Sequence, residues 1–155
     1  MGRISYLVLQ YPQLSESYAS TEMRAVQPEY ELDVISLRPA DVESEAAVPF
    51  VIEGDETKIL ERMRAFRPDV IHTHWLGNHL GLACRVARKL DVPLSIRAHS
   101  FDVLWAWPPR KRLERWFARR ETSKPIAQNL DFLRSEACLG ILTFPFSVER
   151  LGPRQ

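Results

Sequence analysis

The stretch Ile4-Ser5-Tyr6-Leu7-Val8-Leu9, at the start of the 155-residue chain, decides the fold class. It is an almost continuous apolar run, which is typical of a β-strand that is covered on both faces. Strands of this kind belong to parallel sheets, in which helices connect one strand to the next. This one stretch therefore predicts an α/β fold.

The rest of the chain alternates short apolar runs with longer amphipathic stretches. The apolar runs predict strands at Leu32–Leu37, Asp69–Thr73, Val92–Ala98, Pro125–Gln128 and Ile141–Phe144, and a brief apolar piece lies at Phe50–Ile52. The amphipathic stretches predict helices from the Ser15–Ser17 cluster to Val26 and over Glu53–Phe66, Gly77–Leu90, Arg110–Glu121 and Leu130–Ser135. Strands separated by helices at this spacing imply right-handed βαβ crossovers. We therefore expect a single Rossmann-like domain with a mostly parallel sheet and helices on both faces.

Length and composition exclude several classes of protein. A chain of 155 residues is long enough for one domain but too short for a TIM barrel or a two-domain α/β enzyme. With 45% apolar and 26% charged residues, it is neither disordered nor collagen-like. Its two cysteines, Cys84 and Cys138, both lie in apolar stretches, which predicts buried thiols rather than a disulfide. No apolar run approaches the roughly 18 residues of a membrane span, and the N-terminal run is too short for a signal peptide, so we expect a cytoplasmic protein.

The near-neutral total charge hides an asymmetry along the chain. The 21 basic and 20 acidic residues do not suggest binding to nucleic acid. Residues 1–60 carry a net charge of −7, whereas residues 61–155 carry +8. The second half could therefore face an anion such as a phosphate, a nucleotide or a lipid headgroup. Two solvated faces of opposite charge explain the split equally well.

The sequence lacks the common phosphate-binding and nucleophile motifs. Its six glycines form neither the G-x-G-x-x-G pattern of dinucleotide-binding folds nor a P-loop. It contains no G-x-S-x-G nucleophile elbow either. These absences count against ordinary dinucleotide binding, a P-loop NTPase and an α/β-hydrolase.

Two polar clusters follow predicted strands, and His72-Thr73-His74-Trp75 is the first of them. The alternation of a strand places both of its histidines on one face. Such a pair can hold a divalent metal ion, but the site would need further ligands. We expect instead that one histidine bonds to the backbone while the other lines a cleft, and we assign no metal.

The second cluster, Arg97-Ala98-His99-Ser100-Phe101-Asp102, lies at the end of the next strand. His99 could donate a hydrogen bond to a hydroxyl or phosphate oxygen, with Arg97 adding positive charge and Asp102 orienting the ring. Alternatively, Asp102 caps the following segment and His99 bonds to the backbone. Because ligands of open α/β sheets bind at the carboxyl ends of the strands, the two clusters together predict one shared cleft.

A third feature is a basic segment with interleaved aromatic residues. Within the predicted helix Arg110–Glu121, the side chains of Leu113, Trp116 and Phe117 share a face and arginines occupy the rest. A helix of this kind suits an anionic membrane surface. The membrane-facing residues would be Trp105, Trp107, Arg112 and Trp116. The commoner alternative is that the apolar face docks on the protein's own sheet.

Four segments, in this order, make the chain resemble a known family. They are Tyr6–Tyr18 with Glu22–Ala25, then Arg67–His74, Val92–Asp102 and Thr143–Pro153. Each is similar to a motif of the N-terminal domain of the family-4-type GT-B glycosyltransferases, which build polysaccharides and glycolipids. Together the four segments span nearly the whole chain.

The resemblance implies a function and a set of site residues. In that family the N-terminal Rossmann-like domain binds the acceptor, and the C-terminal domain binds the nucleotide sugar. Sugar is transferred to a glycan or a lipid-linked acceptor in the cleft between them, usually with retention and without a metal or other cofactor. The resemblance implies that His99 contacts the transferred sugar or the developing charge of the leaving group, and that it is the catalytic residue. The substrate-binding residues would be Ser15, Glu16, Ser17, His74, Trp75, Arg97 and Asp102.

The chain departs from the family pattern in two loops and in its expected domain content. No glycine occurs between Gln10 and Ser17, and Ser147 and Glu149 stand where the family has Gly and Asp. We expect a domain over residues 1–146 and a linker-like tail over 147–155, with no donor-binding domain. Such a half-enzyme would need a partner chain to act. The alternative is a non-catalytic module that docks to a protein or to the inner face of a membrane.

Overall fold

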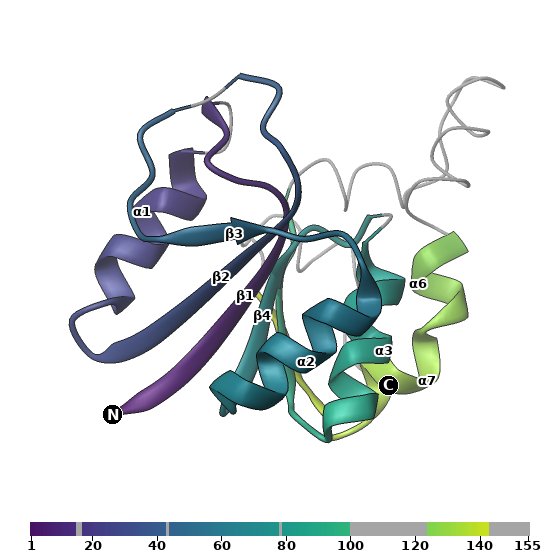
Figure 1. Cartoon of the computed structure of the whole chain (residues 1–155). Coiled ribbons are helices and arrows are strands. Elements are labelled where there is room, and N and C mark those ends of the chain that lie inside the picture. Colours follow the sequence, from purple (N-terminus) through teal and green to yellow (C-terminus); the bar gives the residue numbers. More distant parts are fainter. Residues whose placement is uncertain (15–16, 43, 78, 100–123, 143–155) are drawn as a thin grey trace, which may run out of the picture.

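A six-stranded, all-parallel sheet forms the centre of the computed structural model, which describes residues 1–155 except 15–16, 43, 78, 100–123 and 143–155 (Figure 1). The strand order is β3-β2-β1-β4-β5-β6. The strands are β1 (Gly2–Gln10), β2 (Tyr30–Arg38), β3 (Phe50–Ile52), β4 (Val70–His74), β5 (Leu94–Arg97) and β6 (Cys138–Leu142). The chain thus runs outward from β1 to one edge of the sheet and then returns to build the other half from β4.

Helices cover both faces of the sheet, which confirms the predicted Rossmann-like α/β class. The helix α1 (Ser17–Val26) lies on one face, and the other helices of the described residues lie on the opposite face (Figure 1). Those others are α2 (Glu56–Phe66), α3 (Leu80–Leu90), α6 (Lys124–Gln128) and α7 (Leu130–Arg134). None of the helices in the described part of the chain is long and apolar enough to cross a membrane.

The apolar run in β1 is continuous because its two faces belong to two different cores. Leu7 packs among the residues that α2 and α3 bury, whereas Tyr6 and Val8 pack on the α1 side with Met23. Successive side chains of a strand point to opposite faces, so a strand between two helical layers is apolar at nearly every position. The position of β1 in the middle of the sheet follows from this pattern.

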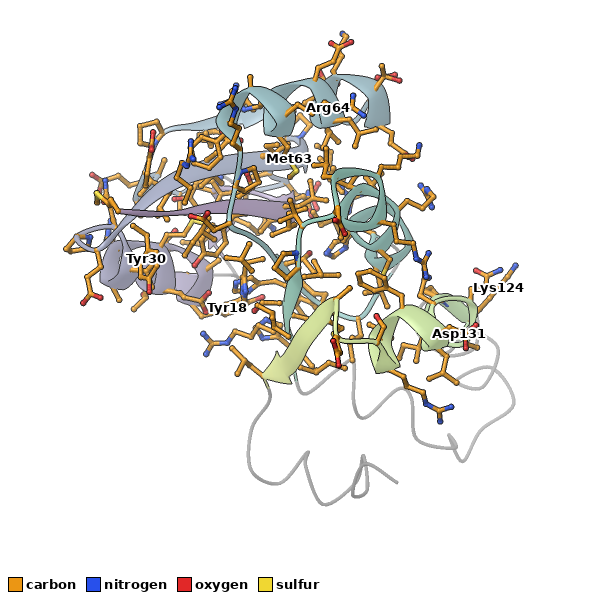
Figure 2. All side chains as sticks on the ribbon, turned by 90° about the horizontal axis from the view of Figure 1, so that it is seen from below. Tyr18, Tyr30, Met63, Arg64, Lys124 and Asp131 are labelled. Atoms are coloured by element: carbon orange, nitrogen blue, oxygen red, sulfur yellow. The ribbon has the colours of Figure 1, made fainter. Side chains whose placement is uncertain are left out.

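Capping explains where α2 begins and ends. The Asp55 carboxylate accepts hydrogen bonds from the backbone N–H groups of Thr57 and Lys58, at 2.9 and 3.1 Å. The helix therefore starts at Glu56, three residues after the predicted Glu53, because Asp55 satisfies its first N–H groups. Along the helix, Met63 points into the core and Arg64 points away from it (Figure 2).

One predicted strand is wrong, and several boundaries differ. Residues Pro125–Gln128 form most of α6, not a strand. Proline is tolerated in the first turn of a helix, and the Asn129 amide donates to the Pro125 carbonyl oxygen at 2.9 Å. The last described strand begins at Cys138 rather than Ile141, and α3 begins at Leu80 rather than Gly77. The predicted helix Arg110–Glu121 lies outside the described residues.

The two cysteines are buried and form no disulfide, as predicted. Cys84 lies on α3, and Cys138 begins β6. Burial raises the pKa of the Cys84 thiol to about 11. A thiol with so high a pKa is almost entirely protonated at neutral pH and is a poor nucleophile.

Candidate functional site

The candidate site lies where the strand order reverses, between β1 and β4. From β1 the chain builds outward through β2 and β3, whereas β4, β5 and β6 build in the other direction. In open α/β sheets the crevice at the carboxyl ends of the two central strands is the usual ligand site. Side chains from α1, β4, β5 and the residues after β5 meet at this place.

The neighbouring strands β4 and β5 present four polar side chains to the α1 side of the sheet. His72 pairs in register with Ser95, and His74 pairs with Arg97. Their apolar neighbours Ile71 and Ile96 point to the opposite face, into the core under α2 and α3. The prediction that both histidines of the first cluster share a face is therefore confirmed.

All four histidines of the chain gather here. His72 and His74 come from β4, His79 lies just before α3, and His99 follows β5. Each of the four is less than a tenth exposed. The ring of Tyr18, on α1, lies 5.6 Å from that of His74 and 4.3 Å from that of His99.

Glu22 on α1 is the centre of the cluster, and we did not predict its role from the sequence. Its Oε1 atom lies 3.1 Å from His72 Nε2 and 3.6 Å from His74 Nε2. The Tyr6 hydroxyl donates to the same oxygen at 3.1 Å. The Arg97 guanidinium pairs with the other oxygen, Oε2. One carboxylate from α1 thus contacts side chains of β1, β4 and β5.

The surroundings of Glu22 keep it ionised. Burial alone would raise the pKa of its carboxyl, but the adjacent His72 and His74 rings and the Arg97 guanidinium hold that pKa well below its usual range. The pKa of Tyr6 is raised, by burial first and then by the negative charge of Glu22. At neutral pH the cluster therefore contains a carboxylate, a guanidinium and a neutral phenol.

His74 and His99 share one hydrogen bond, with 3.2 Å between His74 Nδ1 and His99 Nε2. Burial, followed by the neighbouring His74 and Arg97, lowers the pKa of His99 to about 4. His99 is therefore uncharged at neutral pH. Because one of the two bonded nitrogens must donate and the other accept, the tautomer of His74 determines the tautomer of His99.

Trp75 holds an unusual backbone conformation at the end of β4. Its φ angle is 74°, in the left-handed region that residues with a Cβ atom seldom adopt. Its backbone N–H donates to the Arg97 carbonyl oxygen at 2.9 Å, which ties the ends of β4 and β5 together. The indole ring lies 4.7 Å from the ring of His99.

Of the predicted site residues that the structure describes, four lie together and one does not. His74, Trp75, Arg97 and His99 belong to the cluster. Ser17 is exposed at the start of α1. The other predicted site residues lie outside the described residues; they are Ser15, Glu16, Asp102, Trp105, Trp107, Arg112 and Trp116.

A concave region lies at the opposite end of the sheet, and none of the histidines lines it. It has a volume of about 530 Å³ and is lined by residues before β5 and β6 and by α7, including Arg88, Asp91 and Phe132. The Arg88 guanidinium stacks on the Phe132 ring, 4.8 Å from its centre. This region provides a natural reference when ligand binding at the histidine cluster is tested.

Comparison with known proteins assigns the family. Residues 13–132 match the glycosyl transferase 4-like domain. The chain belongs to this family. The matched part of this glycosyl transferase 4-like domain includes Glu22, Arg97 and all four histidines. No curated sequence shows significant similarity to the chain.

Among solved structures, the domain matches the UDP-GlcNAc 2-epimerase of Methanocaldococcus jannaschii. The TM-score is 0.48 and the sequence identity is 13%. The match covers 91% of this chain and 45% of the epimerase. The chain therefore spans less than half the length of that protein.

Proposed function

We propose that this chain is the acceptor-binding half of a retaining glycosyltransferase, which transfers sugar from a nucleotide sugar to a glycan or a lipid-linked acceptor. One observation carries the proposal. In a glycosyl transferase 4-like domain, the hydrogen-bonded pair His74–His99 lies at the carboxyl edge of the sheet, beside the reversal of strand order. That edge is where a sheet of this type binds its ligand.

The chemistry of His99 fits a role at the transferred sugar. Its ring is uncharged at neutral pH and can donate one hydrogen bond, to a sugar hydroxyl or to an oxygen that gains negative charge. Because the ring is packed against Tyr18 and Trp75 and bonded to His74, its orientation is set before a ligand arrives. A donor that needs no reorganisation stabilises a transition state most effectively.

His74 and Trp75 would line the acceptor side of this cleft, and Arg97 would supply positive charge to it. The indole of Trp75 offers an apolar face with a polar edge, a combination that suits a sugar ring. Arg97 is a third exposed although it pairs with Glu22. Nucleotide-sugar binding would then rest mainly on a second domain, within a longer chain or on a partner, and the 155-residue chain alone should be inactive.

Binding is tested with the 155-residue chain on an array of immobilised glycans and with a panel of UDP- and GDP-sugars in solution. We expect binding to a subset of the glycans, weakened at least about tenfold by His99→Ala, since one buried hydrogen bond is lost. Arg64→Ala, on the exposed face of α2, should bind as the wild type does. Equal binding by the His99→Ala variant would remove His99 from the site.

A further inference from the structure

Three buried ring nitrogens of the histidine cluster lack a hydrogen-bond partner among the described residues: Nε2 of His72, Nε2 of His74 and Nδ1 of His79. A buried polar atom without a partner is costly unless an ion, a water or a ligand satisfies it. The two Nε2 atoms face the same carboxylate oxygen, Oε1 of Glu22.

We propose that Glu22, His72 and His74 form a binding site for a divalent transition-metal ion, with Zn²⁺ the best match. Their three candidate ligand atoms all lie within 4.8 Å of one another. Zinc holds nitrogen and oxygen ligands tetrahedrally at about 2.0–2.1 Å, which separates neighbouring ligand atoms by about 3.3 Å. The distances of 3.1 and 3.6 Å from Glu22 Oε1 to the two nitrogens lie on either side of that separation.

The chemistry of the three side chains also suits zinc. Two histidines and one glutamate are a ligand set that leaves the fourth tetrahedral position open to water or substrate. From the sequence we assigned no metal, because the pair on β4 had no third ligand. The structure supplies that ligand from α1, which packs against the face of the sheet where both histidines point.

The second nitrogen of each ring is held as metal-binding histidines require. His72 Nδ1 lies 2.9 Å from the Ser95 hydroxyl, and His74 Nδ1 lies 3.2 Å from His99 Nε2. A histidine that ligates a metal usually donates its other N–H to such a partner, which fixes the ring orientation. Both rings are thereby turned so that Nε2 faces Glu22.

The other contacts of Glu22 set limits on the affinity of the site. Arg97 pairs with Oε2, so that Oε1 stays directed at the two nitrogens. The positive charge of Arg97 opposes a divalent cation, and the Tyr6 hydroxyl competes for the same oxygen. We therefore expect a site of moderate affinity rather than one that holds zinc irreversibly.

A metal ion at this site would set the tautomer of His99. With Nε2 bound to the ion, His74 carries its proton on Nδ1 and donates to His99 Nε2. The proton of His99 must then lie on its Nδ1 atom. The ion would thus decide which nitrogen of His99 donates to a sugar; this consequence rests on the proposed function, whereas the metal site itself does not.

The test uses the whole 155-residue chain, stripped of metal with EDTA and titrated with Co²⁺ and then with Zn²⁺. We expect one equivalent of Co²⁺ to give the strong visible absorption of a tetrahedral site, and one equivalent of Zn²⁺ to remove it. His72→Asn and Glu22→Gln should weaken the affinity for zinc at least about 100-fold, and Ser95→Ala about tenfold. His79→Gln, which changes a buried histidine of the same cluster outside the ligand set, should leave the affinity unchanged.

Two outcomes would overturn the metal site. One is a folded wild-type chain that takes up neither ion at about 100 μM, a concentration well above the dissociation constant expected for a site of moderate affinity. The other is unchanged zinc binding by His72→Asn. If circular dichroism shows that a variant does not fold, histidine ¹⁵N NMR of the wild type decides instead. Zinc bound at this site must shift the ¹⁵N signals of Nε2 of His72 and of His74. Zinc binding without these shifts would also refute the proposal.

Discussion

Replacing His79 by glutamine tests how the buried histidines couple the stability of the fold to pH. His79 is 5% exposed, and its Nε2 donates to the His74 carbonyl oxygen. Burial lowers the pKa of His79 from 6.5 to about 4. That hydrogen bond opposes the shift in part, and the nearby His74 and Arg38 add to it. Glutamine keeps a side-chain N–H donor but cannot take up a proton in this range.

The sign and size of the effect follow from the two pKa values of His79. Above pH 6.5 the folded and unfolded chains both hold it neutral, so its contribution to stability is fully present. Below that pH the unfolded chain takes up a proton, and the folded chain does so only near pH 4, so stability is lost as the pH falls through this window. Between about pH 7.5 and about pH 5, this difference lowers the free energy of unfolding by about 2 kcal/mol.

The assay is urea unfolding followed by circular dichroism at a series of pH values, with EDTA present to keep His74 free of metal. Between about pH 7.5 and about pH 5, the free energy of unfolding of the wild type should fall by about 2 kcal/mol more than that of His79→Gln. Arg64→Gln, an exposed change on α2, should follow the wild-type slope. If wild type and His79→Gln lose the same free energy within about 0.5 kcal/mol, the buried neutral state of His79 is wrong.

Three further predictions concern the α2 side of the sheet. Arg62→Ala should cost about 2 kcal/mol in urea unfolding, because it leaves the buried carboxylate of Asp33 without the half-exposed guanidinium that lies 2.6 Å away. The double variant Asp33→Leu, Arg62→Leu should recover most of that loss, and no recovery would contradict the reasoning. Met63→Ala, at a fully buried position, should cost about 3 kcal/mol by the same measurement, and a cost under about 1 kcal/mol would contradict its burial. Cys84 should react slowly with a thiol reagent at neutral pH and rapidly in urea, since burial raises its pKa to about 11; fast labelling of the folded chain would show that it is exposed.

Local patterns in the sequence predict most of the sheet. The central strands β1 and β4 are recognisable because covered strands are apolar on both faces, and β5 follows from the next apolar run. The segment Pro125–Gln128 is too short to show a helical or a strand period, so its helical state depends on its packing against α3. Helix starts are equally hard to place, because a single cap such as Asp55 decides them.

The site was predicted only where it lies on strands. Alternation along β4 places His72 and His74 on one face, and the strand end after β5 leads to His99. Glu22 was not predicted, because its role depends on which face of β4 is covered by α1, and this is a property of the packed molecule. Two signals could have indicated its role: Glu22 lies in a segment that resembles a family motif, and Tyr18 and Glu22 are one helical turn apart on α1.

The most direct test of the proposed sugar site is a backbone and histidine ¹⁵N NMR titration of the 155-residue chain with a glycan that it binds on the array. We expect the largest shifts at His74, Trp75, Arg97 and His99, and none around Phe132 at the opposite end of the sheet. Shifts confined to the region of Arg88 and Phe132, with the histidine signals unchanged, would contradict the assignment of the sugar site. Turnover of a nucleotide sugar by the pure chain would contradict its role as half of an enzyme.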